Sequence, residues 1–301
     1  MKSEIIKGYE LIGGVLLSFG IAALTVDYIS NFFPDISSYE SVFWGWWGCI
    51  ILSAPYYLSK KNMLPRMKQE LQSHGKLLLG TALMTSAAGI MWFWSMFQTT
   101  SGMVALLGQA EMIFAFILGI IFLKERVNIK EIIGLLVALA GFVILSYTKG
   151  EITPFTLFII MLLNFLYAAQ SFCVKKFGNN IDSIPYSYLR VLIMAILMSI
   201  YLLSLHSISW VGWFPFFILA GGQIFGFILG RTFYFQAHKY LNISTLNSLL
   251  LFEPVPILIG GFLLFGDVIT PQKAWGSILI FLGLLYFSWE KQELKTVSSE
   301  P

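Results

Sequence analysis

Long apolar runs separated by short polar stretches repeat along the whole chain. Most runs have about the 20 residues that a helix needs to cross a bilayer, and Gly, Pro and polar residues interrupt them, for example at 31–34 and 266–271. The longest gap, 59–76, is too short to hold a soluble domain. We therefore expect an all-α integral membrane protein with ten transmembrane helices. The expected spans are 9–29, 41–58, 77–97, 101–123, 131–147, 154–174, 185–205, 212–236, 243–265 and 273–289.

Composition indicates the same class of protein. Hydrophobic residues make up 57% of the chain and charged residues 12%, whereas soluble domains are about 25% charged. This balance excludes a soluble enzyme, a disordered protein and a nucleic-acid-binding protein, and it makes the lipid bilayer the expected partner. Cys49 and Cys173 both lie in apolar runs, so we interpret them as buried apolar side chains rather than as a disulfide or metal site.

Lysine and arginine are distributed unequally between the loops. Of the 19 such residues, 15 lie in the termini and in alternate loops, and the other set of loops holds only Lys149 and Lys273. Loops that are rich in these residues stay in the cytoplasm. We therefore expect both termini to be cytoplasmic and place the multi-pass protein in a plasma membrane, the inner membrane of a bacterium.

The chain matches itself without gaps at a shift of 142 residues, which aligns Glu111 with Glu253. The two halves, 1–149 and 150–290, each hold five expected spans, and 291–301 is an expected cytoplasmic tail. Because five is odd, the second half would enter the membrane from the opposite face, as in the inverted repeats of many transporters. A duplication kept only for packing is the alternative. The aligned glycines are Gly119 with Gly261, Gly134 with Gly276, and Gly141 with Gly283.

Short motifs lie at the ends of the fourth and ninth spans, in the helices after them, and in the sixth and seventh spans. They are FLKER at 122–126, Ile133-Gly134, AGFVIL at 140–145, the segment 167–176, Arg190, FEPV at 252–255, Gly260-Gly261, LFGD at 264–267, Trp275-Gly276 and Leu282-Gly283. In these segments the chain resembles the EamA-type permeases of the drug/metabolite transporter (DMT) superfamily. The resemblance covers nearly the whole chain and implies ten helices in two inverted halves and a metabolite transporter.

Residues suited to catalysis or metal binding are not grouped in the sequence. His74, His206 and His238 lie far apart. We find around none of them the ligand spacing or the set of acidic neighbours that is typical of a metal site. We therefore expect no enzymatic activity, no metal and no cofactor.

Ionisable residues inside the spans are the strongest candidates for function, because each costs at least about 2.5 kcal/mol at the bilayer centre unless it is compensated. Glu111 lies ten residues into the fourth span, about 15 Å deep, and Glu253 is its equivalent in the ninth. Arg231 reaches the depth of Glu253, so we expect an ion pair between them. The shift places Gly89 opposite Arg231, which leaves Glu111 without an equivalent cation. Burial of such a carboxyl favours its protonated form, so Glu111 is the candidate for proton coupling.

Uncharged polar and aromatic side chains complete the expected site between the halves. The structural alternative is that the two glutamates only lock helix packing. The candidate substrate-binding residues are Trp92, Glu111, Asn164, Gln170, Gln223, Arg231, Tyr234, Asn247 and Glu253.

Taken together, these features predict a secondary transporter for small metabolites that works by alternating access. Amino acids or related solutes are the expected substrates, export is the expected direction, and either proton exchange or the substrate gradient drives transport. One alternative is a nucleotide-sugar or organophosphate exchanger, although we expect such anionic substrates to need more intramembrane cations than Arg190 and Arg231. Another is a non-transporting scaffold or lipid-handling protein.

Overall fold

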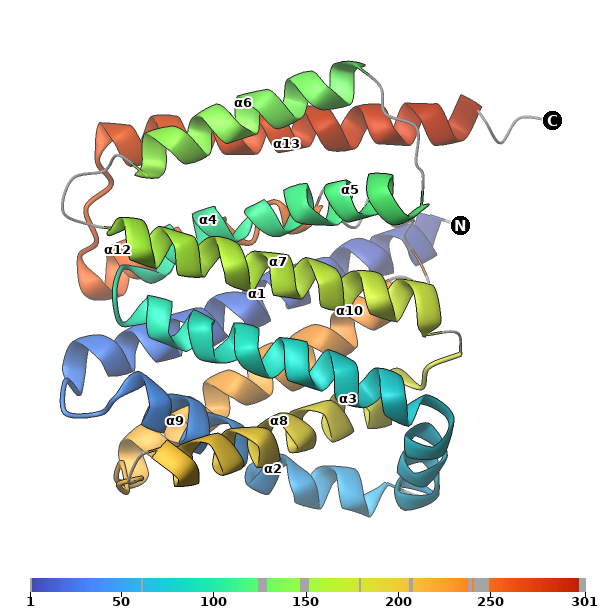
Figure 1. Ribbon diagram of the computed structural model, residues 1–301, viewed down its shortest axis with the longest axis vertical. Helices are drawn as coiled ribbons and strands as arrows, with labels where there is room; N and C mark the ends of the chain where they lie inside the picture. The colour runs from blue at the N-terminus through green and yellow to red at the C-terminus, as the bar shows by residue number, and fades with distance from the viewer. Residues whose placement is uncertain are drawn as a thin grey trace.

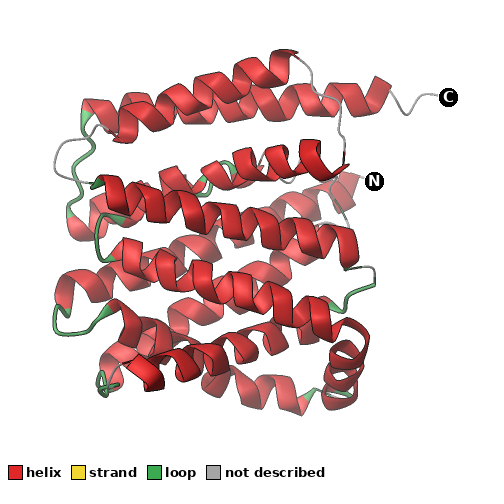
Figure 2. Ribbon diagram, viewed as in Figure 1, coloured by secondary structure: helices red, strands yellow, loops and turns green. Residues whose placement is uncertain are grey.

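The computed structural model describes residues 2–60, 62–123, 129–146, 152–178, 180–205, 208–237, 240 and 249–297. Every regular element within these ranges is a helix (Figure 2), which confirms the all-α class. The elements are α1 Lys2–Phe32, α2 Ser38–Ser59, α3 Met63–Met96, α4 Ser101–Gly108, α5 Ala110–Leu123, α6 Ile129–Ser146, α7 Pro154–Phe177, α8 Ser183–Leu205, α9 Trp213–Gln223, η1 Ile224–Gly230 (a π-helix), α10 Arg231–Ala237, α12 Pro254–Phe265 and α13 Pro271–Val297.

The helix ends follow ordinary local rules. Ser37 and Glu40 form a capping box at the start of α2, in which each satisfies a backbone N–H group of the first turn. Thr153 caps α7, and Pro154 occupies its first turn, where a missing N–H group costs nothing. Gly266 ends α12 in the left-handed conformation, with φ of +71°, which favours glycine.

Two segments differ from the sequence-based expectation. The expected loop 59–76 is largely helical, because α3 begins at Met63 and is kinked at His74, with φ −124° and ψ 17°. The expected tail 291–301 begins as a continuation of α13, which ends at Val297.

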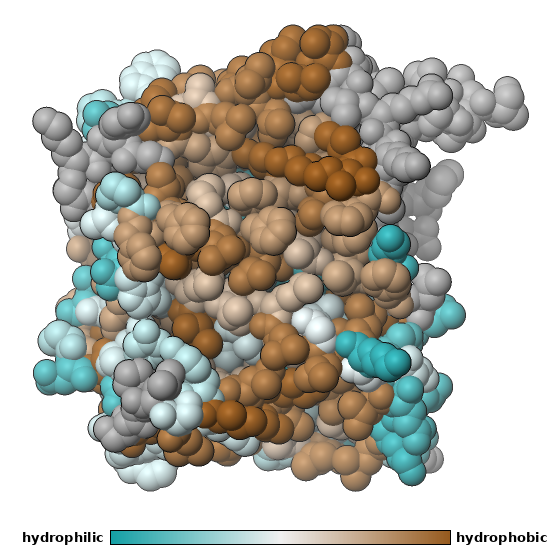
Figure 3. All heavy atoms as spheres, viewed as in Figure 1, coloured by the Kyte–Doolittle hydropathy of each residue, from teal (hydrophilic) through white to brown (hydrophobic). Residues whose placement is uncertain are grey.

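Six helical stretches among the described residues are long and apolar enough to cross a membrane. The shorter helices Ile132–Leu145 and Pro254–Phe265 are also apolar. Figure 3 shows apolar side chains across the middle of the molecule and polar side chains toward its two ends. The start of α1 and the end of α13 lie at the same end of the bundle (Figure 1). The six stretches are Ile6–Phe32, Met63–Met96, Ser101–Phe122, Pro154–Val174, Ile184–Ser204 and Trp213–Tyr234.

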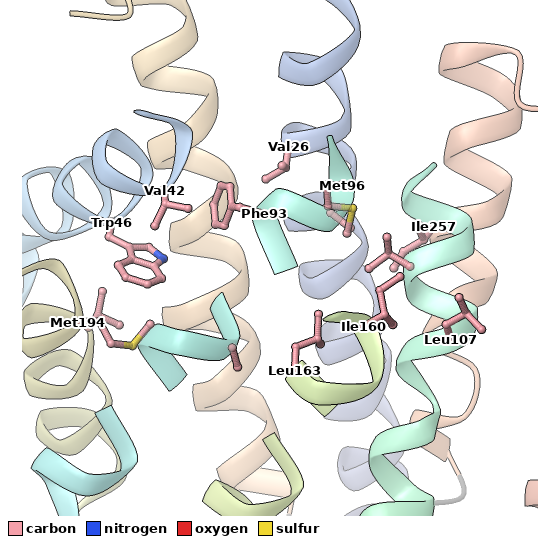
Figure 4. Packing of buried hydrophobic residues seen from close by; sticks show 14 of the residues in the cluster. Val26, Val42, Trp46, Phe93, Met96, Leu107, Ile160, Leu163, Met194 and Ile257 are labelled. Carbon is pink, nitrogen blue, oxygen red and sulfur yellow. The ribbon is translucent and has the colours of Figure 1, made fainter. Parts of the chain in front are cut away.

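Helices from the two halves of the chain pack against one another. Helix α3 packs against α7 and α8, whereas α1 packs against α9, η1 and α10, and α6 lies along α13 (Figure 1). Trp46 of α2 and Phe93 of α3 are fully buried, and Leu107 of α4 and Ile160 of α7 belong to the same apolar core (Figure 4). Lipid tails are as apolar as these side chains, so close packing holds such helices together.

Glycines allow the closest of these contacts, between α6 and α13. A Cβ atom on Gly134 would lie 2.7 Å from the carbonyl oxygen of Gly283, and one on Gly141 would lie 2.7 Å from that of Gly276. Both obstacles are backbone atoms, which cannot rotate aside. The pairing of 134 with 283 and of 141 with 276 also means that the two helices run antiparallel.

A second glycine contact brings α1 close to the π-helix. Gly222, Gly226 and Gly230 recur every four residues, and a Cβ atom on any of them would collide with a side chain of α1. Such a small-residue stripe lets helix backbones approach closely in a membrane. It sets α1 against the chain immediately before Arg231.

The glycine contact between α6 and α13 can be tested by a single methyl group. We expect Gly134→Ala to destabilise the protein by about 1–3 kcal/mol, because the new Cβ atom forces the two backbones apart. Gly80→Ala is the matched control, because Gly80 also lies inside a helix but has no atom within 4 Å of its Cβ position. The control should keep or raise the melting temperature. Equal melting temperatures for the two variants in detergent would contradict the close contact.

Candidate functional site

The fourth expected span is broken next to Glu111. Helix α4 ends at Gly108 and α5 begins at Ala110, so Glu111 lies in the first turn of α5. The backbone N–H of Gln109 donates to Leu106, and that of Met112 donates to the Gln109 carbonyl. The regular helical hydrogen bonding is therefore interrupted at Gln109, although this residue keeps helical dihedral angles, with φ −63° and ψ −11°, and 101–122 remains one apolar helical stretch.

The ninth expected span is interrupted at the equivalent place. Residues 251–253 form a turn, and α12 starts at Pro254 with Glu253 at its N-cap position. Pro254 fits there because its missing N–H group is not needed in a first turn. Each glutamate therefore lies at the N-terminal end of a half-helix, where the helix dipole favours a negative charge. Transporters bind ligands and coupling ions at such interrupted helices.

Arg231 follows another irregularity, the π-helix η1. Single π-turns inside α-helices recur at functional sites. The guanidinium carbon of Arg231 lies 5.4 Å from the ring centre of Phe19 on α1, which is within the range of a cation–π contact. The irregular segment and the packing of α1 thus together position this cation.

The charged residues of the two halves form one group. Arg231 attracts both Glu111 and Glu253, while the two carboxylates repel one another. The Tyr167 side chain on α7 interacts electrostatically with all three. These groups are buried among the helices, yet each keeps part of its surface accessible.

This arrangement corrects the expected pairing of Arg231 with Glu253 alone. Arg231 is the strongest charged neighbour of Glu111, whereas the strongest charged neighbour of Glu253 is Glu111. No nitrogen of Arg231 lies within 4.0 Å of either carboxylate in the described part of the chain. Glu111 therefore does have a cationic neighbour, and Arg231 is shared between the two glutamates.

One face of α7 places hydroxyl and amide side chains beside the charged group. The Ser171 hydroxyl donates to the Glu111 carboxylate at 3.3 Å. Tyr167, Gln170 and Ser171 are spaced three and four residues apart and so share a helix face. Gln170 is buried, and its Oε1 atom has no hydrogen-bond partner among the described residues.

Asn164, another candidate on α7, has a different contact. Its Nδ2 atom donates to the Leu107 carbonyl at 3.1 Å and to the Ile160 carbonyl at 2.7 Å. In an uninterrupted helix the Leu107 carbonyl would accept from the N–H group four residues later, that of Glu111. The Asn164 amide therefore supports the break between α4 and α5.

The remaining candidates lie at several places. Tyr234 interacts electrostatically with Arg231 and Glu111 and belongs to the charged group. Gln223 is buried, and its Nε2 atom has no hydrogen-bond partner in the described part of the chain; a Cβ atom on Gly45 would lie 3.1 Å from its side chain. Trp92 stacks edge-on against Phe93, and no interaction among the described residues links it to the charged group. Asn247 lies outside the described residues.

Sequence reasoning missed Tyr167, Ser171 and Asp27, and it named Arg190 without including it in the site. The spacing of Tyr167, Gln170 and Ser171 was the available signal for α7. Asp27 of α1 is 3% exposed and accepts hydrogen bonds from the Ser101 hydroxyl at 2.5 Å and the Ser101 backbone N–H at 3.3 Å. It therefore attaches α1 to the N-terminus of α4.

Other polar features lie apart from the charged group. His74 does have an acidic neighbour, contrary to the expectation, because its Nδ1 atom lies 3.0 Å from Glu70. Among the described residues, no three His, Cys, Asp or Glu side chains could together hold a metal ion. A hollow of about 380 Å³ lies between the C-terminal end of α1, the start of α2 and the segment before α9. No residue of the charged group lines it.

Comparison with known proteins assigns the chain to a family. The model of the EamA-like transporter family matches residues 7–147 and 154–289. The chain therefore belongs to the EamA-like transporter family, and it is an integral multi-pass membrane transporter of small solutes. A solved structure described only as "Crystal structure of protein" has a TM-score of 0.65 and 12% identity, covering 98% of this chain and 99% of that chain; it supports the fold alone. No curated protein matches the chain.

The shared cation predicts an order of stability for two matched variants. Glu111→Gln loses the attraction to Arg231, which we expect to cost about 1–3 kcal/mol. Glu253→Gln loses a smaller attraction and also relieves its repulsion from Glu111, so it should cost less or stabilise the protein. Melting temperatures of the two variants in the same detergent test this order. A larger loss for Glu253→Gln would restore the original pairing of Arg231 with Glu253.

Proposed function

We propose that the protein is a secondary transporter that exports amino acids or related small metabolites by alternating access. The observation that carries this proposal is the buried charged group, to which the first half contributes Glu111 and the second half Arg231 and Glu253. Each of these groups is costly inside a membrane, which favours a role in binding over a role in packing alone. Partial accessibility of these side chains is what a site for a small solute needs.

Many transporters that work by alternating access have two halves of opposite orientation, and we propose ten spans in two inverted repeats, 1–149 and 150–290. The crosswise glycine contacts support this arrangement. Gly134 is equivalent to Gly276 and Gly141 to Gly283 in the sequence, but Gly134 meets Gly283 and Gly141 meets Gly276. A two-fold axis between α6 and α13 produces this crossing, whereas a simple translation of one half does not.

Proton exchange is the proposed driving reaction, with Glu111 as the carrier. Its carboxylate has both a cation, Arg231, and a hydroxyl donor, Ser171, as neighbours. A substrate that competes for these neighbours would change the affinity of Glu111 for protons. By thermodynamic linkage, protonation would change substrate affinity to the same extent.

The topology can be tested by labelling single cysteines in intact cells, in a Cys49→Ala, Cys173→Ala background. Position 35 follows the first expected span, and the thiol introduced by Asp35→Cys should react with a membrane-impermeant maleimide. Lys68→Cys is exposed on the first turns of α3 and should react only after the membrane is permeabilised. Reaction of both sites from the same side would contradict the proposed orientation.

Transport can be measured in proteoliposomes with an amino-acid panel that also includes nucleotide sugars and organophosphates. We expect amino-acid transport that depends on pH in the wild type and is nearly independent of pH in Glu111→Gln, because glutamine cannot carry a proton. Glu10→Gln changes an exposed glutamate of α1 and should keep the wild-type profile. A wild-type profile in Glu111→Gln would contradict its coupling role, and transport of only the phosphorylated compounds would contradict the substrate class.

A further inference from the structure

Arg190 on α8 is a buried cation for which the described residues supply no hydrogen-bond or ion-pair partner. Its side chain is 1% exposed, and its Nε and Nη2 atoms have no hydrogen-bond partner among the described residues. A guanidinium group carries five donors in a rigid fork and cannot lose its proton. Leaving such donors unsatisfied in the interior of a membrane protein is costly, so their burial calls for an acceptor that arrives from outside the chain.

The described residues around Arg190 do not supply this acceptor. The side chain that acts on Arg190 most strongly is that of Arg231, which repels it. The phenol groups of Tyr186 and Tyr167 interact with Arg190 more weakly. Tyr186 already shares a hydrogen bond with Thr81 at 2.8 Å. No carboxylate of the described residues lies within 4.0 Å of Arg190.

Charges of both signs act on Tyr167. Its side chain interacts electrostatically with Arg190 and Arg231 and with Glu111 and Glu253, and α8, which carries Arg190, packs against α10, which begins at Arg231. A small molecule with a negative and a positive group matches this mixed set of charges, whereas a purely cationic or purely apolar solute leaves Arg190 unsatisfied.

We infer that Arg190 binds the carboxylate of a zwitterionic substrate whose ammonium group faces Glu111 and Glu253. This inference rests on the proposed transport function and deepens it by naming which group of the substrate the arginine recognises and which the glutamates recognise. The planar guanidinium fork matches the two oxygens of a carboxylate. A phosphate ester with two negative charges fits less well, because Glu111 and Glu253 would repel the second charge.

The test compares ligands that differ only in the carboxylate. Binding to the purified protein is measured by thermal stabilisation with the proteinogenic amino acids, and the best ligand is then compared with its methyl ester. In the wild type the ester should bind about 10- to 100-fold more weakly, the range expected for losing a charge-assisted hydrogen bond. Arg190→Gln should bind the acid and the ester about equally. Equal binding of both in the wild type, or an equal loss for both in Arg190→Gln, would overturn the inference.

The stability of the ligand-free variant separates binding from a structural role. Arg190→Gln should melt at or above the wild-type temperature, because it removes an uncompensated buried charge. A structural arginine would lower the melting temperature when it is replaced. Arg66→Gln is the control, since Arg66 forms an ion pair with Asp182 at 2.6 Å and has no contact with the charged group among the described residues; it should keep the acid-to-ester ratio. If Arg190→Gln does not fold, Arg190→Lys keeps the charge without the fork and should reduce the ratio only in part.

A further pair of probes keeps this test independent of amino-acid transport. Benzoate should stabilise the wild type more than benzamide at equal ionic strength, and Arg190→Gln should abolish the difference. If no amino acid binds but benzoate passes this test, the proposed substrate class is wrong and the carboxylate site stands. If benzoate and benzamide act alike, or inorganic phosphate stabilises more than benzoate, the carboxylate assignment is wrong.

Discussion

The cost of placing ionisable side chains among apolar helices is the constraint on which this structure depends. Glu111, Glu253 and Arg231 compensate one another only in part, since one cation serves two carboxylates. The chain reduces the cost by breaking helices at these points. The glutamates lie at the N-terminal ends of α5 and α12, where the helix dipole is positive. The Ser171 hydroxyl donates to the Glu111 carboxylate, and the Asn164 amide donates to the Leu107 carbonyl.

These breaks need rigid neighbours, because an interrupted helix has lost part of its own hydrogen bonding. Asp27 attaches the end of α1 to the start of α4 through Ser101. The glycine stripe at 222, 226 and 230 brings α1 against η1, so the same helix contacts both irregular segments. Helix α1 thus connects the region of Glu111 with that of Arg231, although these residues are 120 positions apart in the sequence.

The sequence predicted the helical class and the family, because apolar runs and repeated motifs are local signals. It did not predict that 101–123 and 243–265 are each interrupted. Gly108 and Pro254 are permissive signals, since glycine and proline also occur within continuous membrane helices. The sharing of Arg231 was missed because depth along a helix fixes one coordinate only, and the rotation of each helix decides which side chains meet. His74 was misjudged for a simpler reason, because Glu70 lies four residues before it and one helical turn joins them.

The two halves of the proposed repeat carry different charges, and this difference makes the proposed site asymmetric. A shift of 142 residues equates Glu253 with Glu111, but it equates Arg190 with Gly48 and Arg231 with Gly89. In the first half, packing occupies both glycine positions, because a Cβ atom on Gly48 would collide with Ala220 and one on Gly89 with Trp46. Both cations therefore come from the second half, whereas each half contributes one carboxylate. A symmetric scaffold can interchange its two halves between conformations, but a ligand held by an asymmetric set of charges keeps one orientation throughout.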